Sequence, residues 1–213
     1  MSRLTLVIGN KNYSSWSLRA WLALKQTGEG FQEIRLPLHT SEFEKEIVKY
    51  SPSGKVPCLI DGDIHVWESL AICEYLAEKF QKANLWPKDP KARAFARSIS
   101  NEMHAGFMAL RKNCPMKIRE RIKKEISADI QTDIDRITTI WREAREKFGK
   151  GGPFLFGYFT VADSMYAPIV MRFVTYGVKV DPVSKGFMDA ILSLPAMKEW
   201  ISAAEKEVEV LAH

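Results

Sequence analysis

The chain has 213 residues, of which 46% are hydrophobic and 27% are charged, a composition that predicts packed cores and excludes a disordered chain. The excess of basic residues, which gives a net charge of +5, lies after residue 80 and is spread over predicted helices. A nucleic-acid-binding surface needs a concentrated basic patch, so we expect no nucleic-acid partner.

Cysteine and histidine spacing argues against a metal site, and hydropathy argues against a membrane protein. The cysteines, Cys58, Cys73 and Cys114, form no CxxC pair, and the histidines form no HExxH motif. No apolar run approaches the roughly 18–20 residues of a membrane span, and the start of the chain lacks the apolar run of a signal peptide. We therefore expect a cytoplasmic protein with free thiols and no metal.

The first 80 residues alternate between strand and helix patterns. In chain order they predict a strand at 3–9, a helix at 16–27, a strand at 31–36, a short charged helix at 41–49, strands at 56–60 and 64–67, and a helix from about 69 to 80. An Asp-Gly hairpin turn joins the last two strands. The order of these elements predicts a mixed four-stranded sheet with helices on both faces.

Residues 81–90 contain two prolines among mixed polar side chains and predict a linker. All later elements are predicted to be helical: one helix at 91–112, a long helix at 117–148, a helix that starts after Thr160, and two shorter helices near 183–193 and 195–208. Isoleucines recur on one stripe of the long helix, which is typical of core-facing packing. Thr160 and Asp163 form a capping box. We expect an α/β domain at 1–80 and an all-helical domain at 91–213.

Two motifs predict a site for a small zwitterionic peptide. Pro57 stands directly before a strand, where proline donates no hydrogen bond. A cis bond after Val56 would turn the Val56 backbone outward, free to pair with an extended peptide. Eleven residues later Glu68 and Ser69 begin a helix, whose free N–H groups and serine hydroxyl suit a carboxylate, while Glu68 suits an ammonium group. Each motif alone also fits an ordinary turn or a capped helix.

The stretch YSSWSLR at 13–19 lies where a strand ends and a helix begins. Ser14 and Ser15 therefore either cap this helix or hold a ligand at its N-terminus. Lys55, just before Val56, is either an exposed turn lysine or a partner for a ligand carboxylate. Tyr13 offers a further hydroxyl near the same turn.

Together these residues resemble the cytosolic glutathione transferase family, and the resemblance covers essentially the whole chain. It rests on the Ser-Ser helix start, the Val-Pro strand, the run Glu-Ser-Leu-Ala-Ile from Glu68, and FTVAD at 159–163. SSWSLR is most similar to the serine-type classes, zeta and tau, and to a bacterial subgroup with NKNYSSWSLR near its start. Trp16 departs from the zeta type, which has cysteine at this position. The resemblance therefore gives less support for zeta isomerase activity in this chain.

The resemblance implies a thioredoxin-like N-terminal domain, an all-α C-terminal domain and glutathione as a co-substrate, with no metal. It implies that Val56 and the following Pro57 hold the cysteinyl backbone, and that Glu68 and Ser69 hold the γ-glutamyl end. Lys55 is then the candidate partner of the glycyl carboxylate.

The resemblance also implies which hydroxyl activates the thiol. Aligning Arg19 with the arginine of the family motif assigns that role to Ser14, with Ser15 as the runner-up. A hydroxyl that bonds a thiolate better than a thiol lowers the thiol pKa, and the helix N-terminus adds to this effect.

The second substrate of the family binds between the two domains, against the first helix of the helical half. In that helix Met103, Phe107 and Arg111, or alternatively His104, Phe107 and Arg111, share one predicted face. Together with Trp16 they would suit an electrophile that carries an anionic group. Core packing is the alternative for the methionine and the phenylalanine. Tyr166 and Arg172 are weaker candidates.

The resemblance thus implies a glutathione transferase of the detoxification type, and a homodimer, as is usual in the family. The enzymatic alternative is a zeta-like glutathione-dependent isomerase. The alternative from another class is a non-catalytic binding or scaffold protein that keeps the fold.

Overall fold

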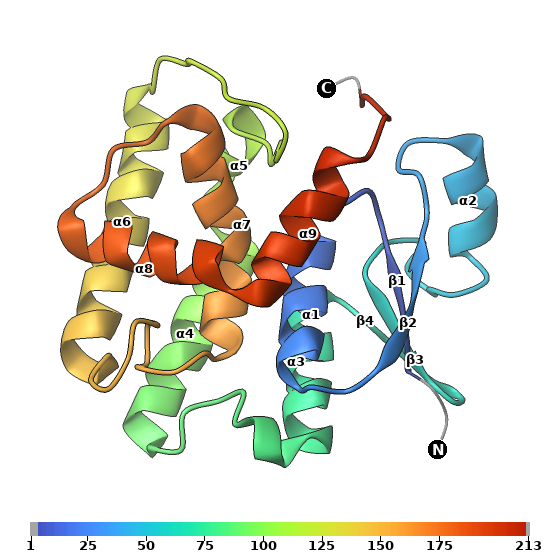
Figure 1. Cartoon of the computed structure of the whole chain (residues 1–213), viewed down its shortest axis with the longest axis horizontal. Helices are drawn as coiled ribbons and strands as arrows, with labels where there is room; N and C mark the ends of the chain where they lie inside the picture. The colour runs from blue at the N-terminus through green and yellow to red at the C-terminus, as the bar shows by residue number, and fades with distance from the viewer. Residues whose placement is uncertain (1–3, 212–213) are drawn as a thin grey trace.

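The computed structural model describes residues 4–211, in which an α/β unit is followed by helices (Figure 1). The α/β unit comprises β1 (Leu4–Ile8), α1 (Ser15–Gln26), β2 (Phe31–Arg35), α2 (Ser41–Ile47), β3 (Cys58–Asp61), β4 (Ile64–Trp67) and α3 (Ser69–Lys79). The predicted order of strands and helices is confirmed. The third strand begins two residues later than predicted, which leaves Val56 and Pro57 outside the sheet.

The four strands of this unit form one mixed sheet in the order β2-β1-β3-β4. β1 runs parallel to β2 and antiparallel to β3, and β3 pairs with β4 as a hairpin. Because alternate side chains of a strand point to opposite faces, Leu6 and Ile8 join the large core shared with α1 and α3, whereas Val7 packs with Ile47 of α2. Helices therefore cover both faces, as predicted.

The second part of the chain is helical. It contains a short 3-10 helix, η1 (Gln81–Ala83), and α4 (Pro90–Ala105), α5 (Met108–Asn113), α6 (Ala128–Phe148), α7 (Val161–Tyr176), α8 (Pro182–Ser193) and α9 (Pro195–Glu205). α7 is buried along almost its whole length and packs against both α1 and α4. The predicted fold class, a thioredoxin-like domain plus an all-helical domain, is confirmed. The exact domain boundaries stay predictions.

The capping box at the start of α7 is confirmed. The Asp163 carboxylate accepts hydrogen bonds from Thr160 N at 2.7 Å and from Leu155 N at 3.0 Å. Burial raises the pKa of Asp163 to about 6. The box therefore joins the preceding loop to the helix that carries most of the interdomain contact.

The prediction of a single helix at 91–112 is wrong, because the helix breaks at Gly106 and Phe107. Phe107 has a left-handed backbone with φ of 60°, which ends α4 and restarts the chain as α5. At Gly106 a Cβ atom would lie only 2.7 Å from the Glu102 carbonyl oxygen, so glycine permits this close exit from the helix.

The prediction of a long helix at 117–148 is also wrong for its first third, since α6 begins only at Ala128. Some backbone N–H groups of this non-helical segment donate to distant partners instead. Ile118 N donates to Asn12 O, and Ile122 N donates to Thr175 O at 2.7 Å. Tertiary hydrogen bonds thus replace the helical ones, and Ile118 is still buried without helical spacing.

The loop between β1 and α1 is held by the C-terminal end of the described chain. The Glu207 carboxylate accepts hydrogen bonds from Lys11 N at 2.7 Å and from Asn12 N at 2.9 Å. Arg119 donates to the backbone carbonyls of Glu207 and Glu209. Segments almost 200 positions apart in the sequence therefore meet just before the serine pair.

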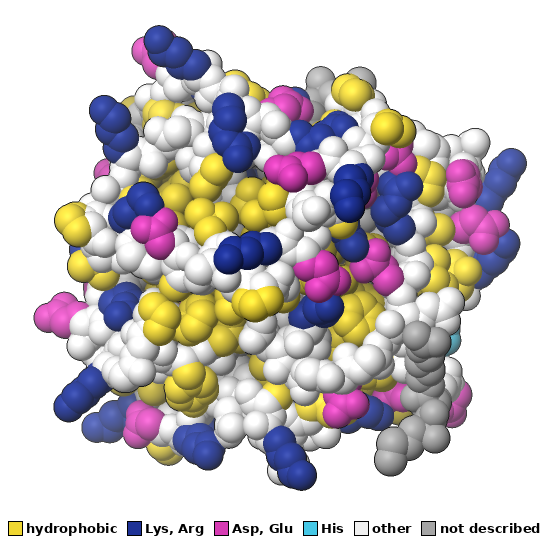
Figure 2. Space-filling model, in the orientation of Figure 1, with side chains coloured by type: hydrophobic (Ala, Val, Ile, Leu, Met, Phe, Trp, Pro, Cys, Tyr) yellow, Lys and Arg dark blue, Asp and Glu magenta, His cyan; other side chains and the backbone are white. Residues whose placement is uncertain are grey.

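Basic and acidic side chains are interspersed over the face drawn in Figure 2, rather than gathered into one patch of a single sign. Within residues 4–211, no helix combines the length and apolar character needed to cross a membrane. The same residues contain no group of three or more His, Cys, Asp or Glu side chains arranged to hold a metal ion.

Candidate functional site

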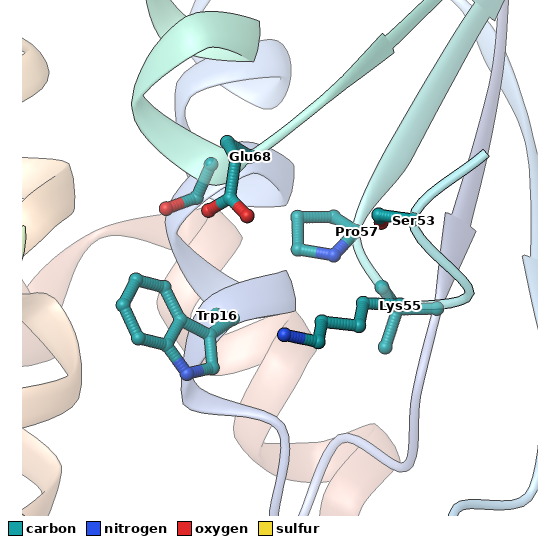
Figure 3. Close-up of a pocket in the computed structure, with 7 residues that line it drawn as sticks. Trp16, Ser53, Lys55, Pro57 and Glu68 are labelled. Carbon is teal, nitrogen blue, oxygen red and sulfur yellow. The ribbon is translucent and has the colours of Figure 1, made fainter. Parts of the chain in front are cut away.

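Two adjoining cavities of about 150 Å³ and 250 Å³ lie where the loop before β3 meets α1. Trp16, Lys55 and Val56 line both of them. Ser53, Pro57, Glu68 and Ser69 complete the smaller cavity. Figure 3 shows the Lys55 amine and the Glu68 carboxylate both facing the space between Pro57 and Trp16. The two predicted peptide-binding motifs are therefore brought to one place.

The Val56–Pro57 bond is cis, as predicted from the proline before the strand. Val56 lies two residues before Cys58, the first residue of β3, and it is not part of the sheet pairing among the described residues. A backbone segment of this kind beside a cavity can pair with an extended peptide chain.

The N-terminus of α3 is open toward the smaller cavity. Within residues 4–211 no side chain caps this helix, and the buried Ser69 hydroxyl has no hydrogen-bond partner. Glu68 has φ of 66°, a left-handed value that costs a residue with a Cβ atom on the order of 1–3 kcal/mol. Uncapped N–H groups, a buried unpaired hydroxyl and a strained backbone together indicate a place for an anionic group.

The two serines of the α1 start make different hydrogen bonds. Ser14 is the N-cap residue: it donates to Ser17 Oγ at 2.7 Å and accepts from Ser17 N at 3.4 Å. Ser15 is the first residue of the helix, and its hydroxyl accepts from Arg172 Nη2 at 3.4 Å. Both serines line the larger cavity, together with Tyr13.

The side of the site that faces the helical domain is aromatic and basic. The Trp16 ring packs edge-on against His104 with ring centroids 5.1 Å apart. The guanidinium groups of Arg19 and Arg111 lie 4.3 and 4.6 Å from the Trp16 ring centroid. His104 Nε2 is 3.7 Å from Glu68 Oε2. Trp16 therefore joins α1 to the end of α4 and to α5 by cation–π and ring contacts.

This environment disfavours positive charge on the side chains it buries. Burial first, and the charge of Arg19 second, lower the pKa of His104. Burial first, and then Arg111 and Arg172, lower the pKa of Arg19 to about 9. Among the described residues, Arg19 Nε and Nη1 have no hydrogen-bond partner. At neutral pH the arginine is charged and the histidine is mostly neutral.

The predicted helical face for a second substrate is only partly assembled. His104, Arg111 and Trp16 lie together. Met103 is fully buried in the core, and Phe107 stands at the left-handed break with 7% exposure. The assumption that these residues share a face of one helix is wrong, because that helix ends at Ala105.

Several lining residues carry no local signal in the sequence. Ser53 lines the smaller cavity, and Leu38 and Phe43 line the larger one from the segment around α2. They come from a connection that precedes the Val-Pro motif, and only folding brings them to it. Tyr13 Oη accepts a hydrogen bond from Arg119 Nη2 at 3.3 Å, so this hydroxyl is tied to the helical domain.

Comparisons with known proteins agree with this architecture. The sequence model described as the glutathione S-transferase N-terminal domain matches residues 13–79. The stringent starvation protein A homolog of Coxiella burnetii is 28% identical over 208 residues, which cover 98% of this chain and 94% of the relative. A probable maleylacetoacetate isomerase of Caenorhabditis elegans is 38% identical over 97 residues, 45% of this chain and 44% of the relative.

The fold is shared with solved structures over nearly the whole chain. A glutathione transferase homolog from Burkholderia, solved with bound glutathione, superposes with a TM-score of 0.72 at 22% identity and covers 96% of this chain and 100% of its own. Residues 13–79 match the glutathione S-transferase N-terminal domain and bring the Val-Pro and Glu-Ser motifs into one site. The chain as a whole, including the helical part, has the fold of glutathione transferases.

Proposed function

We propose that the protein is a glutathione transferase, which binds glutathione in the two adjoining cavities and activates its thiol for attack on a small electrophile. The observation that carries the proposal is the open end of α3, where the buried Ser69 hydroxyl lacks a partner among the described residues and Glu68 has a strained backbone. Unpaired buried polar atoms and backbone strain are unusual in a folded protein and concentrate at binding sites.

The chemistry of glutathione matches the site group by group. The carboxylate of the γ-glutamyl residue would bind the Ser69 hydroxyl and the first N–H groups of α3. The ammonium group of the same residue would bind Glu68. The cysteinyl backbone would pair with Val56, beside Pro57, as one extra strand segment. Lys55, which lines both cavities, would bind the glycyl carboxylate.

The sulfur of a tripeptide in this pose would lie near the start of α1. A free thiol with a pKa near 8.5 is only a few per cent ionised at neutral pH. A serine hydroxyl and the positive end of α1 both stabilise the thiolate, and each unit by which they lower the pKa corresponds to about 1.4 kcal/mol. Ser14 and Ser15 are the proposed catalytic hydroxyls. Ser14 is the assignment that the resemblance implies, but it already donates to Ser17, which favours Ser15 as the donor to sulfur.

The electrophile would bind on the other side of the thiol, against Trp16, His104 and Arg111. A flat apolar group suits the indole ring, and the Arg111 and Arg19 guanidinium groups favour a substrate with an anionic substituent. We further propose, from the family, a cytoplasmic homodimer with a detoxification role.

A zeta-like isomerase is the nearest alternative, and the subgroup stays part of the proposal. The Caenorhabditis elegans relative, whose name is that of an isomerase, favours it. In an isomerase glutathione is added and then released, whereas in a transferase it remains on the product. Mass spectrometry of the product therefore separates the two.

A non-catalytic role is the second alternative, because the relative that spans almost the whole chain, a stringent starvation protein A homolog, has a name that states no enzyme activity. Calorimetry with glutathione tests it directly. We expect binding, and no binding at millimolar glutathione would refute the transferase proposal.

The catalytic hydroxyl is tested by two matched variants, Ser14→Ala and Ser15→Ala, assayed with glutathione and 1-chloro-2,4-dinitrobenzene. We expect Ser15→Ala to reduce conjugation by at least about tenfold, with a higher apparent pKa in the pH–rate profile. Ser14→Ala removes the cap and is expected to lower stability by about 1 kcal/mol. Full activity in both variants would exclude serine activation of the thiol.

A further inference from the structure

Arg172 is a buried guanidinium group beneath the start of α1. It lies on α7 and is 5% exposed. Its Nε donates to Cys114 O at 3.0 Å and its Nη1 to Pro168 O at 3.4 Å. Its Nη2 donates to Ser15 Oγ at 3.4 Å. Two backbone carbonyls therefore orient the planar group so that its remaining nitrogen reaches the Ser15 hydroxyl.

This contact leaves the two serines in opposite states. The Ser14 hydroxyl donates its hydrogen to Ser17 Oγ, which also accepts from Gly9 N at 3.1 Å. The Ser15 oxygen accepts from Arg172, and within residues 4–211 the Ser15 hydroxyl donates to no acceptor. A hydroxyl has one hydrogen to donate, so the hydrogen of Ser15 remains available for a ligand.

The charge on Arg172 is set by groups on several elements. Burial first, and then the charge of Arg111, lower the pKa of Arg172 to about 10, while Tyr176 and Cys114 act in the opposite direction. Arg19 of α1 is a further cation in the same cluster. At neutral pH Arg172 is therefore charged, and its charge adds to the positive end of the α1 dipole.

We propose that Arg172 is a positioning residue of the thiol site, which holds the Ser15 oxygen so that the hydroxyl hydrogen points to the sulfur of bound glutathione. A hydroxyl that accepts from a cation is also a stronger donor, because hydrogen bonds in a chain polarise one another. This inference rests on the proposed glutathione site. It adds a residue of the helical domain to the proposed glutathione-binding residues, which all come from the first domain.

The test measures ionisation of the bound thiol through thiolate absorbance near 240 nm as a function of pH. We expect Arg172→Met to raise the midpoint of thiol ionisation by about one pH unit. At a pH well below both midpoints, this shift corresponds to about tenfold less thiolate. Arg172→Lys keeps the charge but loses the planar orientation, so we expect a smaller increase. In a protein that already carries Ser15→Ala, Arg172→Met should change the midpoint by less than about a third of the change it causes in the wild type.

S-methylglutathione, which has no thiol, reports whether the site is folded. We expect its affinity to stay within about twofold of the wild type in both Arg172 variants. Arg145 is a matched control, because its Nη1 also donates to backbone carbonyls, those of Gly149 and Gly152, away from the site. Arg145→Met should leave the thiolate midpoint unchanged.

The outcomes are separable. An unchanged midpoint in Arg172→Met, or an equal increase with and without Ser15, would overturn the inference. Should Arg172→Met fail to bind S-methylglutathione, Arg172→Lys decides, and an unchanged midpoint there overturns it. A wild-type protein that binds neither glutathione nor S-methylglutathione refutes the proposed function itself.

Discussion

Replacing Glu207 with alanine removes the group that holds the loop before the serine pair. Its side chain is 7% exposed and accepts two backbone hydrogen bonds, from Lys11 N at 2.7 Å and from Asn12 N at 2.9 Å. Hydrogen bonds to a charged acceptor contribute roughly 1.5–3 kcal/mol each. Because water can reach part of the opened loop, we take the lower value and expect a loss of about 3 kcal/mol. The ion pair with half-exposed Arg35 at 3.6 Å adds little.

For a chain of this length, about 3 kcal/mol corresponds to a decrease in Tm of roughly 6–12 °C, measured by thermal unfolding. Glu207→Gln retains one acceptor oxygen and should lie between the wild type and alanine. Because the loop leads directly to Ser14 and Ser15, we also expect kcat/KM for conjugation to fall on the order of tenfold.

Glu205→Ala is the matched control, since Glu205 is an exposed residue at the end of α9 and should change stability by less than about 0.5 kcal/mol. The reasoning would be refuted if Glu207→Ala melted within about 1 °C of this control, because the two backbone hydrogen bonds would then contribute nothing to stability.

Three further predictions concern titratable groups. The pKa of Asp163 is raised from 3.8 to about 6 by burial, so its contribution to stability is present below about pH 4 and is lost as the pH rises through 6. Relative to Asp163→Asn, urea unfolding of the wild type should therefore show a loss of roughly 2 kcal/mol in the free energy of unfolding between pH 4 and 7, and parallel pH profiles would contradict this. Burial raises the pKa of Cys58 to about 11 and of Cys73 to about 12, so neither thiol should react with iodoacetamide in the folded protein at pH 8; alkylation within minutes, detected by mass spectrometry, would refute this. Glu68→Gln removes a negative charge 3.7 Å from His104 and should lower the already lowered His104 pKa further, measured by NMR titration; an increase would show that the carboxylate does not face the ring.

Local rules were enough to predict most of the first domain. Strand alternation and helix spacing predicted the mixed sheet, and the proline before β3 predicted a backbone turned out of that sheet at Val56. Thr160 and Asp163 predicted a capping box from their spacing alone. These features depend on atoms a few residues apart, so the sequence displays them directly.

The limits of the sequence are seen where distant partners replace local ones. Residues 117–127 have helical spacing, yet the N–H groups of Ile118 and Arg119 donate to Asn12, and that of Ile122 donates to Thr175. A stripe of isoleucines indicates which residues are buried. It does not indicate whether they are buried as part of a helix or by contacts of a non-helical segment. Phe107 likewise ends a helix that its neighbours favour.

The sequence by itself determined that two serines stand at the start of α1, opposite a Val-Pro strand and a Glu-Ser helix start. Only the tertiary structure divided their hydrogen bonds, with Ser14 capping the helix and Ser15 beside Arg172. The physical reason is separation along the chain: the Arg172 guanidinium comes from a helix 157 positions away, and only the packing of α7 against α1 brings the two together.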